Sequence, residues 1–217
     1  MKLLSYDGML AQTIRVVWRY CVLNFCFLVC SLPVVTAGSA ITALYAVMLP
    51  VPEETGYVKK YFKAFASNLK QASAIWMALL GPLVALILAV YFTAIVPFPG
   101  RELIRVLEAV FAVLLMMLLC YVFPLQARYD NPPKTTVRNA FVLCIGAFLP
   151  GLLMATVALA PAILFLVDIE LFVQIFSVCH FFAFAVIVRV NSAICMFVFS
   201  KLDPPTQNPD DYEGENE

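Results

Sequence analysis

The sequence has little charge, and this shortage excludes a soluble protein. Only 13% of its 217 residues are charged, whereas 63% are hydrophobic, and its mean hydropathy is +0.92. Soluble domains carry about 25% charged residues, so the composition indicates an integral membrane protein in a lipid bilayer. Lysine plus arginine and aspartate plus glutamate balance at 14 each. Because no strongly basic field covers the chain, we expect no nucleic-acid partner.

Groups that bind metals or perform catalysis are equally scarce. His180 is the single histidine, which excludes bis-histidine haem ligation and three-histidine zinc ligation within one chain. The sequence contains no GxSxG, no HExxH and no phosphate-binding glycine loop. Its seven cysteines lie in apolar segments without a CxxC pair, where cysteine behaves as a small hydrophobe. A redox pair of Cys26 and Cys30, four residues apart, is the alternative. We expect a protein that is not an enzyme and that holds no cofactor and no metal.

The most informative feature that is present is an uncharged run at residues 21–49, interrupted in its middle. Its 29 residues exceed the length of about 20 that crosses a bilayer, but they are few for two crossings. Pro33 and Gly38 break the helix. Broken backbone at membrane depth needs hydrogen-bond partners from protein or trapped water. We therefore expect neighbouring helices to enclose residues 33–38, with Asn24 facing inward.

The remaining pattern predicts an all-α fold, a polytopic membrane helical bundle with four full spans plus the broken N-terminal segment. We place it in a single membrane domain, residues 1–201, followed by a disordered acidic tail at 202–217. The apolar runs and helical periodicities assign an interfacial helix to 1–20, the broken segment to 21–49, a basic amphipathic helix to 57–71, and spans to 72–96, 103–124, 139–167 and 171–200.

Lysine and arginine predict the sidedness. Eight of them flank the broken segment's exit, the loop between the third and fourth spans, and the C-terminus, whereas two lie in the loop between the second and third spans. The positive-inside rule places the eight, with the C-terminus, in the cytoplasm of a plasma-membrane protein. A helical hairpin at 21–49 would bring the three N-terminal basic residues to the same side. A single crossing would leave them outside, so we favour the hairpin.

Two groups of residues are candidates for function. The first comprises polar or helix-breaking residues inside the membrane: Asn24, Pro33, Thr36, Gly38, Arg189 and Asn191. Arg189 either lines a solute path or anchors the last span at the cytoplasmic headgroups. The second would form a cytoplasmic contact face: Lys59, Lys60, Lys63, Asn68, Lys70, Arg128 and Arg138.

Several motifs in chain order resemble those of the YesL-like family, a group of uncharacterised bacterial membrane proteins. The resemblance spans most of the membrane portion but not residues 81–119 or the tail. The matching residues are Leu23-Asn24, Ser31-Leu32-Pro33-Val34-Val35-Thr36-x-Gly38, Thr42-Ala43-Leu44-Tyr45, Tyr61-Phe62-Lys63-x-Phe65-x-x-Asn68-x-Lys70-Gln71-Ala72, Trp76, Tyr121-Val122-Phe123-Pro124-Leu125-x-Ala127-Arg128-Tyr129, Arg138-Asn139-Ala140 and Asn191-Ser192.

This resemblance implies no assigned activity, but family members are often encoded beside sugar-binding importers and glycan-degrading enzymes. It therefore implies an accessory role in carbohydrate uptake, by association. The first hypothesis is a non-enzymatic membrane partner of an importer complex. The second is a small-solute transporter that uses the broken first segment as its site. A third, an enzyme on lipid-linked glycans, lacks a visible catalytic pair.

Overall fold

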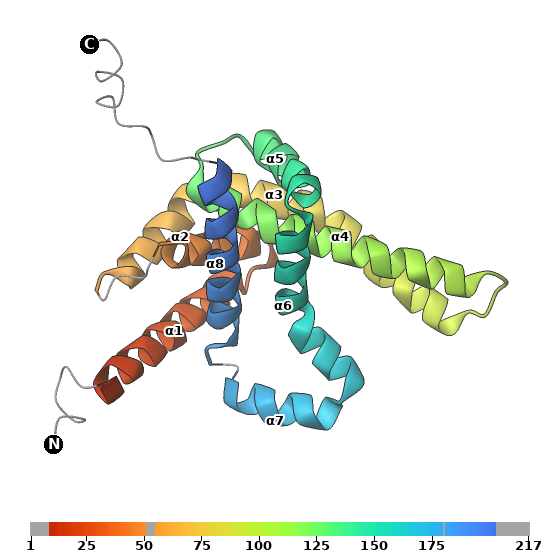
Figure 1. The fold of residues 1–217 in the computed structure, drawn as a ribbon, viewed down its shortest axis with the longest axis horizontal. Coiled ribbons are helices and arrows are strands. Elements are labelled where there is room, and N and C mark those ends of the chain that lie inside the picture. Colours follow the sequence, from red (N-terminus) through yellow and green to blue (C-terminus); the bar gives the residue numbers. More distant parts are fainter. Residues whose placement is uncertain (1–8, 51–54, 180, 203–217) are drawn as a thin grey trace, which may run out of the picture.

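The protein is a bundle of helices that differ widely in length and direction (Figure 1). The structure, a computed structural model, describes residues 9–50, 55–179 and 181–202, and these residues contain no strand. Among them, five helices are long and apolar enough to cross a membrane: Ala11–Ser31, Tyr57–Ile95, Arg101–Arg128, Phe148–Val167 and Ala183–Leu202. The predicted all-α, multi-pass membrane fold is confirmed.

The uncharged run is broken where proline and glycine predicted it. Helix α1 (Met9–Ser31) is followed by a single 3-10 turn, η1 (Val34–Thr36), and then by α2 (Ala37–Met48). Pro33 lies between them with extended backbone, φ −74° and ψ 115°. With 12 residues, α2 is about 18 Å long, too short to cross the hydrocarbon. It is the central helix of the fold and packs on α1, α3, α4 and α8.

The expectation that neighbouring helices enclose the whole break is wrong. Leu32, Val34 and Val35 are 79%, 58% and 52% exposed, and burial begins only at Gly38. The reason is that these turn residues satisfy much of their backbone hydrogen bonding within the turn, as the Thr36 amide does by donating to the Pro33 carbonyl at 2.9 Å. Their apolar side chains therefore do not need a protein cover.

Residues 57–96 form one helix rather than the two predicted. Helix α3 (Tyr57–Ile95) has 39 residues and continues through Pro82. Its length of about 58 Å is nearly twice the hydrocarbon thickness. Helix α4 (Arg101–Arg128) returns beside it, and the distal halves of α3 and α4 project together from the bundle (Figure 1). We call this projection, residues 82–114, the arm.

Each of the last two predicted spans is divided. The span expected at 139–167 consists of α5 (Pro133–Gly146) and α6 (Phe148–Val167), and Ala147 between them has φ −124° and ψ 51°. Pro150 explains the division, because a proline clashes with the carbonyl four residues before it and so prevents a continuous helix. The span expected at 171–200 consists of α7 (Ile169–Cys179) and α8 (Ala183–Leu202).

Some sequence predictions concern residues that the structure does not describe. These are the first eight residues of the interfacial helix, His180, and positions 203–217 of the acidic tail. The remaining part of the interfacial helix belongs to α1, which continues without interruption to Ser31.

Candidate functional site

Asn24 holds the beginning of α8 from another helix. Its side chain is 1% exposed, and its Oδ1 accepts a hydrogen bond from the Ala185 backbone N–H at 3.3 Å. Ala185 is the third residue of α8. The first four N–H groups of a helix have no acceptor within the helix, so an amide oxygen here stabilises the helix end as an N-cap does. Asn24 is therefore a cap supplied by α1.

Arg189 performs the converse task at the end of α2. Its Nη1 donates to the carbonyl oxygen of Met48 at 2.7 Å, and Met48 is the last residue of α2. The final carbonyls of a helix are unpaired and carry partial negative charge. A guanidinium on this carbonyl is therefore stabilised without a carboxylate. This contact was not predicted, because the sequence gives no sign of which helix end lies beside Arg189.

The two other interruptions are also held by side chains from a different helix. Trp76 on α3 donates its Nε1–H to the Val34 carbonyl at 2.8 Å, and the Thr36 hydroxyl donates within the break, lying 2.7 Å from the Cys30 carbonyl. Tyr121 on α4 donates to the carbonyl of Ala147, between α5 and α6, at 2.6 Å. Thus the aromatic residues Trp76 and Tyr121 satisfy carbonyls that the broken helices cannot.

Gly38 allows α2 to approach α3 closely. A Cβ at this position would collide with the backbone carbonyl oxygen of Ala72 and with the Cβ of Trp76. Both are rigid parts of α3, so neither can move away. Since Trp76 also contacts Val34, Gly38 determines how the break sits on α3.

A cavity of about 330 Å³ lies between α1, α2, α3, α4, α6 and α8. Its wall is mostly aliphatic and aromatic, with Phe27, Trp76, Phe123 and Phe184 among the lining residues. Asn191 and Tyr45 supply the polar side chains of the wall. The structure thus places Asn191 at this cavity, whereas Arg189, two residues earlier, points to α2.

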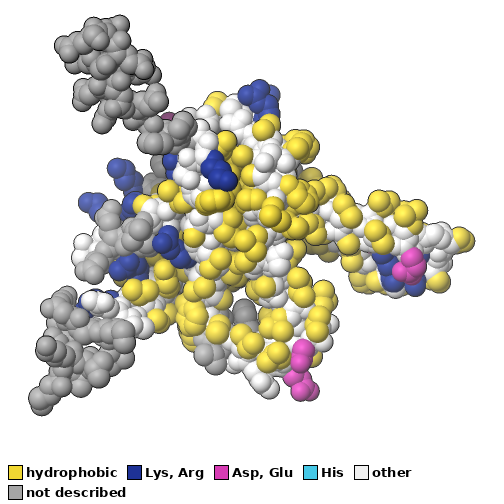
Figure 2. Space-filling model, in the orientation of Figure 1, with side chains coloured by type: hydrophobic (Ala, Val, Ile, Leu, Met, Phe, Trp, Pro, Cys, Tyr) yellow, Lys and Arg dark blue, Asp and Glu magenta, His cyan; other side chains and the backbone are white. Residues whose placement is uncertain are grey.

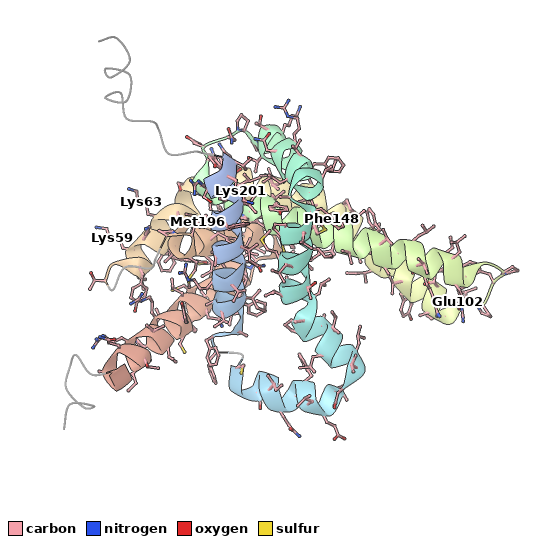
Figure 3. All side chains as sticks on the ribbon, in the orientation of Figure 1. Lys59, Lys63, Glu102, Phe148, Met196 and Lys201 are labelled. Atoms are coloured by element: carbon pink, nitrogen blue, oxygen red, sulfur yellow. The ribbon has the colours of Figure 1, made fainter. Side chains whose placement is uncertain are left out.

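The basic residues of the predicted contact face gather at one end of the bundle. Figure 2 shows lysine and arginine over α1, the start of α3, and α5 and α8, while acidic side chains lie on α7 and at the tip of the arm. In Figure 3, Lys59 and Lys63 point outward from α3, and Glu102 lies at the far end of the arm. Lys59, Lys63, Lys70, Arg128 and Arg138 are exposed, and Lys60 and Asn68 are half-buried. We call these seven residues the basic face.

A buried polar network joins the helices that carry the basic face. Gln126 on α4 is 3% exposed; its Nε2 donates to Gln71 Oε1 at 2.7 Å and to Asn68 Oδ1 at 3.3 Å, both on α3. Its Oε1 accepts from the Thr136 hydroxyl of α5 at 2.9 Å. The network holds α3, α4 and α5 in one register. Sequence reasoning found Asn68 but missed Gln71, Gln126 and Thr136, although a glutamine at the end of an apolar run was a usable signal.

The arm contains a buried carboxylate that the sequence reading placed only near the start of a span. Glu108 is 9% exposed, and its Oε2 lies 3.0 Å from the hydroxyl of Thr93 on the opposing helix. Its Oε1 has no hydrogen-bond partner among the described residues. Arg105 donates to the backbone carbonyl of Thr93 at 3.2 Å. These contacts fix the pairing of α3 with α4 within an otherwise apolar hairpin.

Comparison with known proteins locates a family pattern at the centre of this architecture. No curated protein and no solved structure matches the chain. Residues 20–91 match the model of a family described as "Protein of unknown function, DUF624". They include the second half of α1, the break, α2 and most of α3, where Asn24, Gly38 and Trp76 make the contacts described above. Over residues 20–91 the chain therefore carries the pattern of the DUF624 family, which confirms the resemblance drawn from its motifs.

Proposed function

We propose that this chain is a non-enzymatic membrane component that docks, through its basic face, on an acidic cytoplasmic surface of a carbohydrate importer. One observation carries the proposal: the buried Gln126 network fixes basic segments of three helices relative to one another. Lysines on a flexible loop attract any anionic surface, whereas charges held in one geometry select a complementary one. The link to carbohydrate uptake rests on the family resemblance alone.

The proposal places the basic face in the cytoplasm by the positive-inside rule. The loop side of the other membrane face supports this, because Asp168 and Glu170 stand there without a nearby lysine or arginine in sequence. A partner with clustered aspartate and glutamate would meet the basic face with opposite potential. Its association would weaken as ionic strength rises.

Affinity purification in mild detergent tests this role. Wild-type protein should recover importer subunits at low salt, and the Lys59→Glu/Lys63→Glu variant should recover about tenfold less, since each reversal replaces attraction with repulsion. The matched control, Lys59→Arg/Lys63→Arg, keeps both charges and should behave as wild type. Equal recovery by all three proteins would refute docking through this face, as would wild-type preparations that retain anionic lipid but no importer subunit.

A transporter of small solutes is the second candidate, and the cavity beside the break favours it. Trp76, which lines the cavity, also contacts Val34 in the break, the kind of interrupted segment at which transporters bind substrates. A sugar would leave most of its hydroxyls without partners on this apolar wall, so the candidate solute is apolar. Uptake by purified protein in liposomes would support transport, and uptake no faster than in empty liposomes would exclude it.

A further inference from the structure

We propose that the central cavity binds a small apolar molecule with one hydrogen-bond donor, such as a phenol, and that Asn191 Oδ1 accepts that hydrogen bond. The inference is independent of the docking role proposed above, because the cavity lies inside the bundle and the basic face at its end. Three observations support it: the size and lining of the cavity, the unpaired acceptor at its wall, and the scarcity of other polar groups there.

The size and lining define the ligand class. A volume of about 330 Å³ falls at the lower end of the range of ligand pockets, so the space suits a molecule of one or two rings. Four aromatic side chains, Phe27, Trp76, Phe123 and Phe184, contribute to the wall. Aromatic walls favour a flat apolar ligand, because rings pack in offset or edge-to-face arrangements.

Asn191 supplies the specificity. It is 1% exposed, and its Nδ2 lies within donor distance of the Met154 carbonyl at 3.5 Å and of Cys120 Sγ at 3.8 Å. These acceptors determine which way the amide is turned, since the reverse orientation would set two oxygens against each other. Its Oδ1 is left with no partner among the described residues. A buried acceptor without a donor is costly, and a ligand hydroxyl would remove that cost.

The cavity wall excludes other ligand classes by what it offers. Besides Asn191, Tyr45 is the polar side chain on it, and no lysine, arginine, aspartate or glutamate lines it. An ion would lack a counter-charge, and a sugar would lack partners for its hydroxyls. An acyl chain would fill the space but bring no donor to Asn191.

Tryptophan fluorescence can report binding directly. The sequence contains two tryptophans, and Trp18 is 65% exposed, so a Trp18→Phe variant leaves Trp76 in the cavity wall as the sole reporter. We would titrate this variant in detergent with 4-bromophenol, whose bromine quenches indole, and with 4-bromoanisole, which has the same ring but no donor. Saturable quenching by the phenol is expected, with half-saturation at a concentration about fivefold lower than for the anisole, as one hydrogen bond supplies.

Two variants in the Trp18→Phe background separate cavity binding from partition into the micelle. Asn191→Leu keeps the volume but removes the acceptor, so the two probes should become equivalent. Ala158→Phe fills the cavity from α6, where Ala158 lines the wall, and should abolish saturable quenching by both. Equal quenching by phenol and anisole in the parent protein would overturn the proposal, and so would saturation that survives Ala158→Phe.

Discussion

At the scale of single residues, the polar side chains of this membrane protein act mainly on backbone groups of other helices. Asn24 accepts from the third amide of α8 and Arg189 donates to the last carbonyl of α2. Trp76 and Tyr121 donate to carbonyls at two helix breaks. Residue type alone showed that Asn24 and Arg189 needed partners inside a bilayer. It did not show which partners, because these lie up to 161 positions away in sequence.

Replacing Arg189 tests the capping role. Arg189→Leu should lower the free energy of unfolding by about 1–3 kcal/mol, because the Met48 carbonyl loses its charged donor in a partly buried site. Arg189→Lys should retain part of the stability, since it keeps the charge at the end of the α2 dipole. Chemical unfolding in mixed micelles measures both. Unchanged stability of Arg189→Leu would mean that the hydrogen bond contributes nothing.

Gln126 permits a second test at this scale. Gln126→Leu leaves Gln71 and Thr136 without their partner in a buried site, and should cost about 1–3 kcal/mol of stability. Gln174→Leu is a suitable control, because Gln174 is exposed on α7 and should tolerate the change. The same unfolding measurement applies, and equal effects of the two substitutions would contradict a structural role for the network.

At the scale of helices, sequence periodicity located the apolar segments but not their ends. The break at residues 32–36 was visible because proline and glycine stand in an uncharged run. The break at Ala147 was not recognised, although Pro150 marks it, because a proline in the first turn of a helix resembles one in an uninterrupted span. Conversely, Gly81 and Pro82 suggested an interruption, yet α3 runs through both.

Gly38 provides a test of how α2 packs. Gly38→Ala should destabilise the protein by about 1–3 kcal/mol, because the added methyl meets the Ala72 carbonyl and Trp76 Cβ, which cannot move without separating α2 from α3.

Gly81→Ala is the matched control for that substitution. It is also a helical glycine, but a Cβ there would meet no atom within 4 Å. Alanine should stabilise α3 at this site by about 0.5–1 kcal/mol. Thermal unfolding in detergent should therefore shift in opposite directions for the two variants, and a shift in the same direction would contradict the close approach at Gly38.

At the scale of the whole molecule, charge separates two ends. The basic face lies on the segments joined by Gln126, whereas Asp168 and Glu170 occupy the exposed start of α7. If the positive-inside rule orients the protein, these two groups lie on opposite sides of the membrane.

Single reporter cysteines at Lys134 and Asp168, in a cysteine-free variant, test that orientation. Both positions are exposed. An impermeant maleimide added to intact cells should label Asp168→Cys and leave Lys134→Cys unmodified until the cells are opened. A reporter at Ser5 addresses the hairpin at residues 21–49 in the same way, since a cytoplasmic N-terminus should resist labelling from outside. The reverse pattern at Lys134 and Asp168 would invert the topology.

The sequence by itself determined that the chain is a helical membrane protein, where its first segment breaks, and that residues 20–91 carry a family pattern. These properties follow from local composition and spacing, because apolar run length and helix-breaking residues act on their own segment. Only the tertiary structure decided that α3 is one long helix, that Asn24 and Arg189 cap other helices, and that Asn191 faces a cavity. Those depend on contacts between residues far apart in the chain, which pairwise packing selects and local patterns do not encode.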